Sequence, residues 1–171
     1  PRVLLAGPTD SGKSSVTKLL LSWAVRLQRK PLYIDTDVGQ NNLIMPGCVG
    51  AIPCNMDTMK LAENGVYFDL SAASPLVYFY GHDNLQTNPD YFKYTIDRIA
   101  GSIDERFKSD QDAKNSGFIV DTPGWIDKEG KVLLKHTIEK LRIDLIVVMG
   151  NDRLFREFSS TYGKEKVIKL P

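Results

Sequence analysis

The segment GPTDSGKSS, residues 7–15, places the strongest constraint on how this chain can fold. It fits the pattern G-x-x-x-x-G-K-[ST], follows the apolar run VLLA at residues 3–6, and precedes a helical pattern from Lys13 to about Arg29. Glycines allow a tight turn in which successive backbone N–H groups point at phosphate oxygens, and the helix start adds its positive dipole end. The segment therefore predicts a phosphate-binding loop, or P-loop, between a buried strand and a helix.

The motif also predicts roles for the residues of this loop. Lys13 is predicted to reach the β- and γ-phosphates of a nucleotide, and the hydroxyl of Ser14 is predicted to bind Mg²⁺. Asp10 is less usual, because a carboxylate repels phosphate, and contact with the base or ribose, a helix cap and exposure to solvent all remain open for it. The predicted nucleotide-binding residues are Thr9, Asp10, Ser11, Gly12, Lys13, Ser14 and Ser15.

Apolar strands and amphipathic helices alternate along the rest of the chain. Further strands are predicted at 32–35, 75–81, 117–121, 144–150 and 166–170, and further helices around 92–107, 131–142 and 152–160. In the first helix, apolar residues recur at the spacing of one face that we expect to pack on the core: Val16, Leu19, Leu20, Trp23, Ala24 and Leu27. The segment 39–70, rich in glycine and proline, is expected to hold short extended pieces. This order predicts an α/β P-loop NTPase fold, with a mostly parallel sheet and helices on both faces.

Length and composition suit one domain and limit its partners. The chain has 171 residues, 42% of them hydrophobic, and a formal net charge of +1. Any nucleic-acid site therefore has to be a local patch of Lys and Arg. No apolar run approaches the roughly 20 residues that cross a bilayer, so we expect no membrane partner. Strand patterns start and stop at the chain ends, so we expect residues 1–171 to be one P-loop domain of a longer protein.

Two carboxylates and an amide follow the predicted strand at 32–35. Asp35 and Asp37 come at its carboxyl end, the edge where parallel α/β sheets bind ligands, and period-two alternation predicts that both lie on one side. They suit Mg²⁺ ligands and a base near an incoming hydroxyl, and Gln40 suits the orientation of an acceptor. The alternative is a solvated turn in which the aspartates cap backbone groups.

The segment FIVDTPGW raises the question of a GTPase. Strand-Asp-x-x-Gly is how many GTPases hold Mg²⁺ and sense the γ-phosphate, a part that Asp121 and Gly124 fit. A GTPase should also carry Asn-Lys-x-Asp after a later strand, but that place reads VVMGNDRLF, with Asn151 and Asp152 adjacent. The missing guanine signature weakens the GTPase hypothesis without removing it.

Three further side chains are candidates for the transfer of a phosphoryl group. Trp125, after a strand-end glycine, is predicted to stack on a base, worth about 1–3 kcal/mol, with packing on a neighbouring loop as the alternative. Arg153 and Arg156 are spaced i, i+3 on a short helix and suit neutralisation of charge on a transferring phosphoryl, with simple solvation as the alternative.

Five segments together resemble a known family. GPTDSGKSS, DTDVGQNN followed by MPGCVGAIP, SPLVYFYGH, DTPGW and NDRLF occur in the order found in eukaryotic RNA 5′-hydroxyl kinases. The resemblance is strongest to the kinase-like members of the pre-mRNA cleavage and polyadenylation machinery, and it covers nearly the whole chain. Such proteins have a small N-terminal β domain, a central P-loop domain and a C-terminal domain, and this chain is similar to the central one.

The resemblance implies a function that composition and spacing do not supply. It implies ATP and Mg²⁺ as cofactors, the 5′-hydroxyl end of RNA or DNA as acceptor, other subunits of an mRNA 3′-end processing complex as partners, a link to tRNA splicing, and a nuclear location. By the same resemblance, Asp37 activates the hydroxyl beside Gln40, Trp125 stacks on the substrate base, and Arg153 lies in a lid helix. Because some fungal members bind ATP without transferring phosphate, a non-catalytic ATP-binding scaffold remains the alternative.

Overall fold

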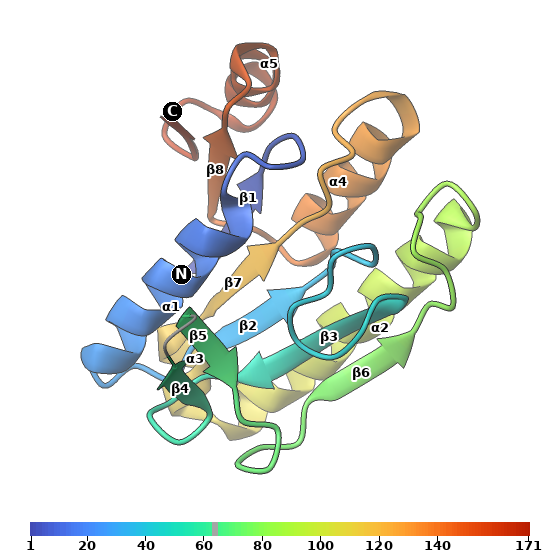
Figure 1. The fold of residues 1–171 in the computed structure, drawn as a ribbon. Helices are drawn as coiled ribbons and strands as arrows, with labels where there is room; N and C mark the ends of the chain where they lie inside the picture. The colour runs from blue at the N-terminus through green and yellow to red at the C-terminus, as the bar shows by residue number, and fades with distance from the viewer. Residues whose placement is uncertain (63–64) are drawn as a thin grey trace.

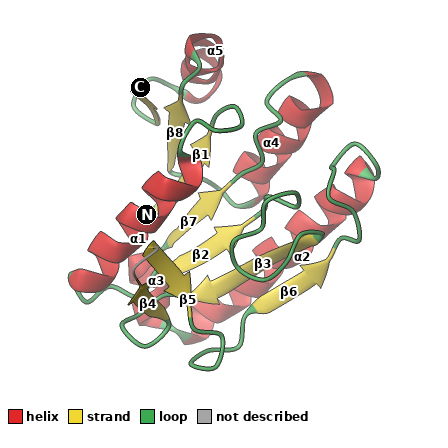
Figure 2. Ribbon diagram, in the orientation of Figure 1, coloured by secondary structure: helices red, strands yellow, loops and turns green. Residues whose placement is uncertain are grey.

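A mixed β-sheet with helices on both faces forms the body of the molecule, as the computed structural model of residues 1–62 and 65–171 shows (Figures 1 and 2). The strand order of the seven-stranded sheet is β6-β3-β2-β7-β1-β8-β9. These strands are β1 (Arg2–Ala6), β2 (Leu32–Asp35), β3 (Cys48–Pro53), β6 (Leu76–Phe79), β7 (Phe118–Asp121), β8 (Leu145–Met149) and β9 (Val167–Leu170). A separate hairpin consists of β4 (Met59–Ala62) and β5 (Gly65–Phe68).

The directions of the strands decide which loops meet. β2, β7, β1, β8 and β9 run parallel, whereas β3 pairs antiparallel with both β2 and β6. Because β6 is reversed twice relative to β2, it points the same way as β2 again. The carboxyl ends of β1, β2, β6 and β7 therefore lie at one edge of the sheet. This mostly parallel sheet confirms the predicted fold class.

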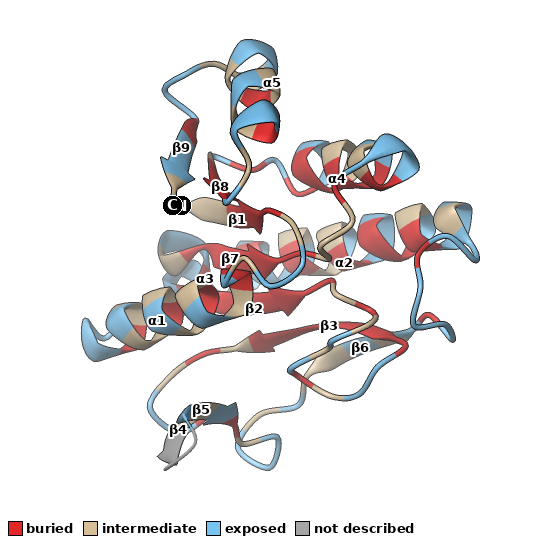
Figure 3. Ribbon diagram, turned by 45° about the horizontal axis from the view of Figure 1, so that its top comes forward, coloured by how far each residue is buried: buried red, intermediate tan, exposed pale blue. Residues whose placement is uncertain are grey.

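Alternation along the strands divides the core into two layers. On one face Leu4, Ile34 and Val120 pack in a cluster with residues of α2 (Pro89–Ser109), α3 (Gln111–Ser116), α4 (Lys128–Lys140) and α5 (Asp152–Tyr162). On the other face Leu5 and Tyr33 pack with α1 (Lys13–Arg26) and with β5 of the hairpin. Figure 3 shows the buried residues gathered on the sheet between the helices. In the described part of the chain, no helix is long and apolar enough to span a membrane.

The periodicity of α2 predicts its buried face correctly. Its repeating apolar residues are all buried: Phe92, Ile96, Ile99, Ile103 and Phe107. Asn88 caps the helix by accepting from the amide of Tyr91, and proline fills the first turn. The segment 39–70 contains short strands, as expected, but one of them, β3, is an inner strand of the main sheet; residues 63–64 lie outside the described residues.

For α1 the prediction of the buried face is only partly confirmed, because Val16 and Leu20 are half-buried against the core but the other large apolar residues of the predicted face are not. Its buried residues follow an i, i+4 series: Lys13, Thr17, Leu21 and Val25. The predicted core positions Leu19, Trp23 and Leu27 are instead 46%, 53% and 76% exposed. The physical reason is the P-loop, which ends in the first turn of the helix. Because Lys13 has to face the loop and the sheet edge, the residues one, two and three turns further on face the sheet.

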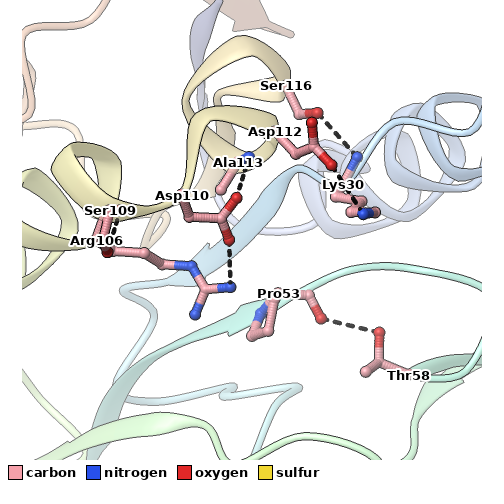
Figure 4. A network of polar contacts seen from close by, with 9 residues as sticks. All are labelled: Lys30, Pro53, Thr58, Arg106, Ser109, Asp110, Asp112, Ala113 and Ser116. Carbon is pink, nitrogen blue, oxygen red and sulfur yellow. Dashed lines mark hydrogen bonds and ion pairs between the residues drawn. The ribbon is translucent and has the colours of Figure 1, made fainter.

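The short helix α3 has no apolar repeat and was not predicted. Its N-cap Asp110 accepts from the amide of Ala113 and pairs with Arg106 at the end of α2, as Figure 4 shows. Lys30 fastens the other side, because its ammonium pairs with Asp112 and its backbone amide donates to Ser116 Oγ. Polar contacts from neighbouring segments, which a one-dimensional pattern does not show, thus hold this helix in place.

Candidate nucleotide and acceptor site

One pocket of about 640 Å³ lies at the edge where the carboxyl ends of β1, β2, β6 and β7 meet. Each of these strands contributes the loop that follows it. The lining residues are Thr9, Asp10, Gly12, Lys13, Ser14 and Ser15 after β1, Asp37, Val38, Gly39 and Gln40 after β2, Asp83, Asn84 and Leu85 after β6, and Pro123, Gly124 and Trp125 after β7. The pocket thus brings together most of the residues that the sequence singles out.

The phosphate-binding loop has the backbone geometry that its motif requires. Gly12 adopts φ of +84°, a left-handed conformation that glycine reaches without the steric cost of a Cβ. Asp10 is also left-handed, at φ of +60°, and is exposed at the rim of the pocket. The Ser11 hydroxyl donates to the carbonyl oxygen of Pro8 at 2.8 Å, so its side chain braces the loop, and Ser11 is not among the lining residues.

Lys13 is the cation that lines this pocket. Its ammonium donates to the carbonyl oxygen of Pro8 at 2.8 Å, which directs it across the loop. Burial lowers the pKa of Lys13, while the carboxylates of Asp121, Asp37 and Asp10 act in the opposite direction. Those three acids favour the charged ammonium and so oppose the effect of burial, beside the place where the motif predicts phosphate oxygens.

Asp121 lies behind Lys13 with a buried and unsatisfied carboxyl group. Burial raises its pKa, which the nearby Ser14 hydroxyl, the Lys13 ammonium and the Thr122 amide lower in part. The hydroxyl and the amide approach without the geometry of a full hydrogen bond, so both oxygens of Asp121 lack a partner among the described residues. A buried carboxylate with free oxygens beside a serine hydroxyl has the donor chemistry that Mg²⁺ prefers.

A magnesium ion at this place would depend on more than protein carboxylates. The described residues hold no group of three or more His, Cys, Asp or Glu side chains that could bind a metal. Mg²⁺ usually takes one or two carboxylates and completes its octahedral shell with water and substrate phosphates. The oxygens of Ser14, Asp37 and Asp121 fit that pattern, so a full set of protein ligands is not required.

The structure separates the two aspartates that the sequence placed side by side. β2 ends at Asp35, so the alternation does not continue to Asp37. Asp37 is half-buried and lines the pocket, and its Oδ1 accepts from the amides of Gly39 and Gln40 at 3.0 Å each. Asp35 is fully buried outside the pocket lining and accepts three hydrogen bonds, so the structure does not support the role of magnesium ligand predicted for it.

Trp125 lies at the pocket with one side packed on the protein. It is half-buried, and a Cβ added at Gly130, in the first turn of α4, would come within 2.5 Å of its ring. A Cβ at Gly124 would likewise overlap the backbone of Thr9. These two glycines let the loop after β7 press against the P-loop while the ring rests on the start of α4. Trp125 is therefore partly exposed at the pocket, and its stacking on a base stays a prediction.

The two arginines are not part of the pocket. Arg153 and Arg156 are exposed on α5, which begins after β8 at the same edge of the sheet. The helix is fastened to α4, because Glu157 pairs with the ammonium groups of Lys131 and Lys135 at 2.7 and 2.9 Å. Contact between these arginines and a phosphoryl group stays a prediction.

The sequence analysis missed the contribution of the loop after β6. Asp83, Asn84 and Leu85 line the pocket opposite the P-loop. Tyr80 shapes this loop, since its hydroxyl contacts the carbonyl oxygens of Leu85 and Asn88 at 3.2 and 3.0 Å. The direction of β6 would have placed this loop at the pocket edge. That direction can be known only once β3 is recognised as the antiparallel strand between β2 and β6.

Comparison with known proteins connects this site to a family. Residues 7–171 match the family model described as the P-loop of the mRNA cleavage and polyadenylation factor CLP1. The chain is 40% identical to a Protein CLP1 homolog of Dictyostelium discoideum, covering all of this chain and 37% of that protein. It is 36% identical to the Polyribonucleotide 5′-hydroxyl-kinase Clp1 of Bos taurus, covering 92% of this chain and 36% of the relative.

Solved structures agree with the sequence matches. The wild-type Clp1p–Pcf11p complex contains a chain that superposes with a TM-score of 0.85 at 26% identity, over all of this chain and 43% of the other. A second Clp1p–Pcf11p structure, described as explaining ATP loss in a point mutant, gives a TM-score of 0.83, also at 26% identity and with 44% of that chain covered. The chain spans well under half the length of the curated relatives named above. By sequence and by fold, this chain belongs to the CLP1 P-loop family of mRNA cleavage and polyadenylation factors.

Proposed function

We propose that this chain is the catalytic P-loop domain of an ATP-dependent polynucleotide 5′-hydroxyl kinase. The observation that carries the proposal is the pocket in which the P-loop, the Asp37 carboxylate and the Trp125 ring face a common space. A phosphate donor, a base and a stacking platform are the parts that transfer to a nucleic-acid end requires. Relatives that carry the name polyribonucleotide 5′-hydroxyl-kinase support the choice of acceptor.

The chain's own residues account for the transfer step. The terminal base stacks on Trp125, and Gln40 and Asp37 hold the 5′-hydroxyl toward the γ-phosphate of ATP in the P-loop. The hydroxyl oxygen bonds to the γ-phosphorus, the bond to ADP breaks, and the hydroxyl proton passes to the carboxylate of Asp37. Lys13 balances the charge that develops on the phosphoryl oxygens. Mg²⁺ held by Ser14 with Asp37 or Asp121 would neutralise further phosphate charge.

The family also supports a cellular setting. We place the chain in mRNA 3′-end processing, with RNA or DNA 5′-hydroxyl ends as acceptors and other subunits of that complex as protein partners. The structurally similar Clp1p is seen in complex with Pcf11p. That role implies a nuclear location.

Label transfer from γ-labelled ATP to a 5′-hydroxyl oligonucleotide tests the proposal. The full chain should label the oligonucleotide, an otherwise identical 5′-phosphorylated oligonucleotide should stay unlabelled, and Lys13→Ala should abolish both ATP binding and transfer. Asp37→Asn should keep ATP binding and lose transfer. Transfer that survives Lys13→Ala contradicts the assignment, whereas tight ATP binding without transfer by the unaltered protein favours the non-catalytic scaffold.

A further inference from the structure

The loop between β2 and β3, residues 36–47, owes its shape to side chains that accept from its own backbone. Asp37 Oδ1 accepts from the amides two and three residues ahead. Asn41 Oδ1 does the same with the amides of Leu43 and Ile44, at 3.0 and 2.8 Å, while its Nδ2 donates to the carbonyl oxygen of Cys48. Such Asx turns fix local bends, and the Gly47 amide joins the ends of the loop by donating to the carbonyl oxygen of Val38 at 2.8 Å, but none of these contacts joins Asp37 to Asn42.

Asp35 joins Asp37 to Asn42 within this loop. Its Oδ1 accepts from the amide of Asp37 at 3.0 Å, and its Oδ2 accepts from the amide of Asn42 at 2.7 Å. The segment between these two amides contains Gly39 and Gln40, so it is the pocket-lining part of the loop. One fully buried carboxyl group therefore holds both ends of the segment that carries the proposed base and the proposed acceptor contact.

Tyr33 fixes the direction of this carboxyl group. Its hydroxyl donates to Asp35 Oδ2 at 2.9 Å, and its ring stacks on Phe68 with 4.9 Å between centroids. Tyr33 and Asp35 are both fully buried. Three donors and a rigid aromatic neighbour leave Asp35 little freedom to rotate toward the pocket.

We propose that Asp35, oriented by Tyr33, is the positioning residue that holds Asp37 and Gln40 in place for transfer. This inference rests on the proposed function, because it assigns Asp35 a task in that same site. It replaces the metal-binding role suggested by the sequence: the carboxyl group acts through the backbone of the loop. A displacement of about 1 Å of a reacting group can lower the rate by about a hundredfold. The hydrogen bonds that hold this loop therefore matter for turnover.

Asp35→Asn is the direct test, because the amide has the shape of the carboxyl group but only one acceptor oxygen. Its N–H₂ group has to face either the Asp37 amide or the Asn42 amide and the Tyr33 hydroxyl, so one set of contacts is lost. We expect ATP affinity within about twofold of the unaltered protein and kcat for transfer lowered by about tenfold to a hundredfold. Hydrogen exchange at the amide that loses its acceptor, either that of Asp37 or that of Asn42, should quicken by about tenfold or more.

Two further variants separate positioning from general damage. Tyr33→Phe keeps the ring and removes one donor, so it should give a smaller change in the same direction and serves if Asp35→Asn does not fold. Thr58→Val removes another fully buried hydroxyl, which donates to the carbonyl oxygen of Pro53 at 2.9 Å (Figure 4). Because β3 runs antiparallel, that turn lies at the edge of the sheet opposite the pocket, and kcat should stay unchanged.

The outcomes are distinguishable. Unchanged exchange at Asp37 and Asn42 in Asp35→Asn, or a loss of ATP affinity as large as that of Lys13→Ala, overturns the inference. Faster exchange and a lowered kcat together with retained ATP affinity support it, and an unchanged kcat in an active protein overturns it. If the unaltered protein transfers no phosphate, the proposed function fails, and hydrogen exchange alone then decides whether Asp35 holds the loop.

Discussion

At the scale of single residues, the placement of Trp125 depends on two positions that have no side chain. Gly124 lets the loop after β7 touch the P-loop, and Gly130 lets the indole ring lie against the start of α4. Each contact would be lost if the glycine that makes it gained a Cβ. The ring that is proposed to stack on the acceptor base is therefore oriented by backbone, and that orientation is open to a direct test.

Gly130→Ala should move this ring, and Gly101→Ala in α2 is the matched control. In a helix, alanine is favoured over glycine by about 1 kcal/mol, and a Cβ at Gly101 meets nothing within 4 Å. Gly101→Ala should therefore stabilise the protein without changing its kinetics. Gly130→Ala should change the tryptophan fluorescence spectrum and raise KM for the oligonucleotide, while ATP affinity stays the same. An unchanged spectrum together with an unchanged KM would show that the ring is not held there.

Asp35 should leave a signature in the pH dependence of stability. Burial and the nearby carboxylate of Asp121 raise the pKa of Asp35 to about 7, against about 4 in the unfolded chain. Between these values the folded protein binds the proton more tightly, so the free energy of unfolding falls as pH rises, by at most about 1.4 kcal/mol per pH unit. Below pH 4 and above pH 7 the contribution is constant.

Denaturant unfolding of the unaltered protein and of Asp35→Asn across pH 4 to 8 measures this effect. As pH rises from about 4 to about 7, the free energy of unfolding of the unaltered protein should fall relative to that of Asp35→Asn. Above about pH 7 the difference should no longer change. A difference that does not vary with pH would mean that Asp35 ionises with an ordinary pKa.

At the scale of elements, the helices show where sequence patterns succeed and where they fail. The buried face of α2 was predictable, because packing on the sheet is the main demand on its sequence and its buried residues, apart from Thr95, are apolar. The face of α1 was not, because its phase is set by Lys13 and its sheet-facing series includes the polar Thr17. Leu19, Trp23 and Leu27 have the spacing of a buried face although they are exposed, so the pattern predicts the wrong residues as core.

A pair of leucines in α1 tests this assignment. Leu21→Ala should lower the free energy of unfolding by about 2–5 kcal/mol, because it empties space in a fully buried position. Leu19→Ala, at a position that is 46% exposed, should cost less than about 1 kcal/mol. Chemical denaturation of both variants gives the comparison, and a larger loss in Leu19→Ala than in Leu21→Ala would mean that the helix packs in the orientation suggested by the sequence pattern.

The loops of the site also include parts that the sequence could predict and parts that it could not. The P-loop, Asp37 and Trp125 could be predicted, because motif and strand-end position identify them directly. The role of Asp35 could not be predicted, because it bonds to backbone amides, which every residue except proline has. The loop at 83–85 was missed because β6 joins the pocket edge only through the antiparallel β3, a pairing made between segments that a linear pattern does not connect.

At the scale of the whole molecule, four loops from strands far apart in the sequence close one pocket, so a nucleotide bound there should stabilise the entire fold. At an ATP concentration of about 100 times Kd, mass action adds about 2.7 kcal/mol to the free energy of unfolding. Lys13→Ala should lose this gain, whereas Trp125→Ala should keep it. Thermal unfolding with and without ATP measures both, and a gain retained by Lys13→Ala would place the nucleotide elsewhere.

The most direct test of the account is a crystal structure with a non-hydrolysable ATP analogue and a short 5′-hydroxyl oligonucleotide. The account predicts the triphosphate along residues 7–15, its terminal phosphate facing Asp37, and the first base of the oligonucleotide against the ring of Trp125. A triphosphate that points away from Asp37, or a 5′ end bound on another face of the molecule, would contradict it.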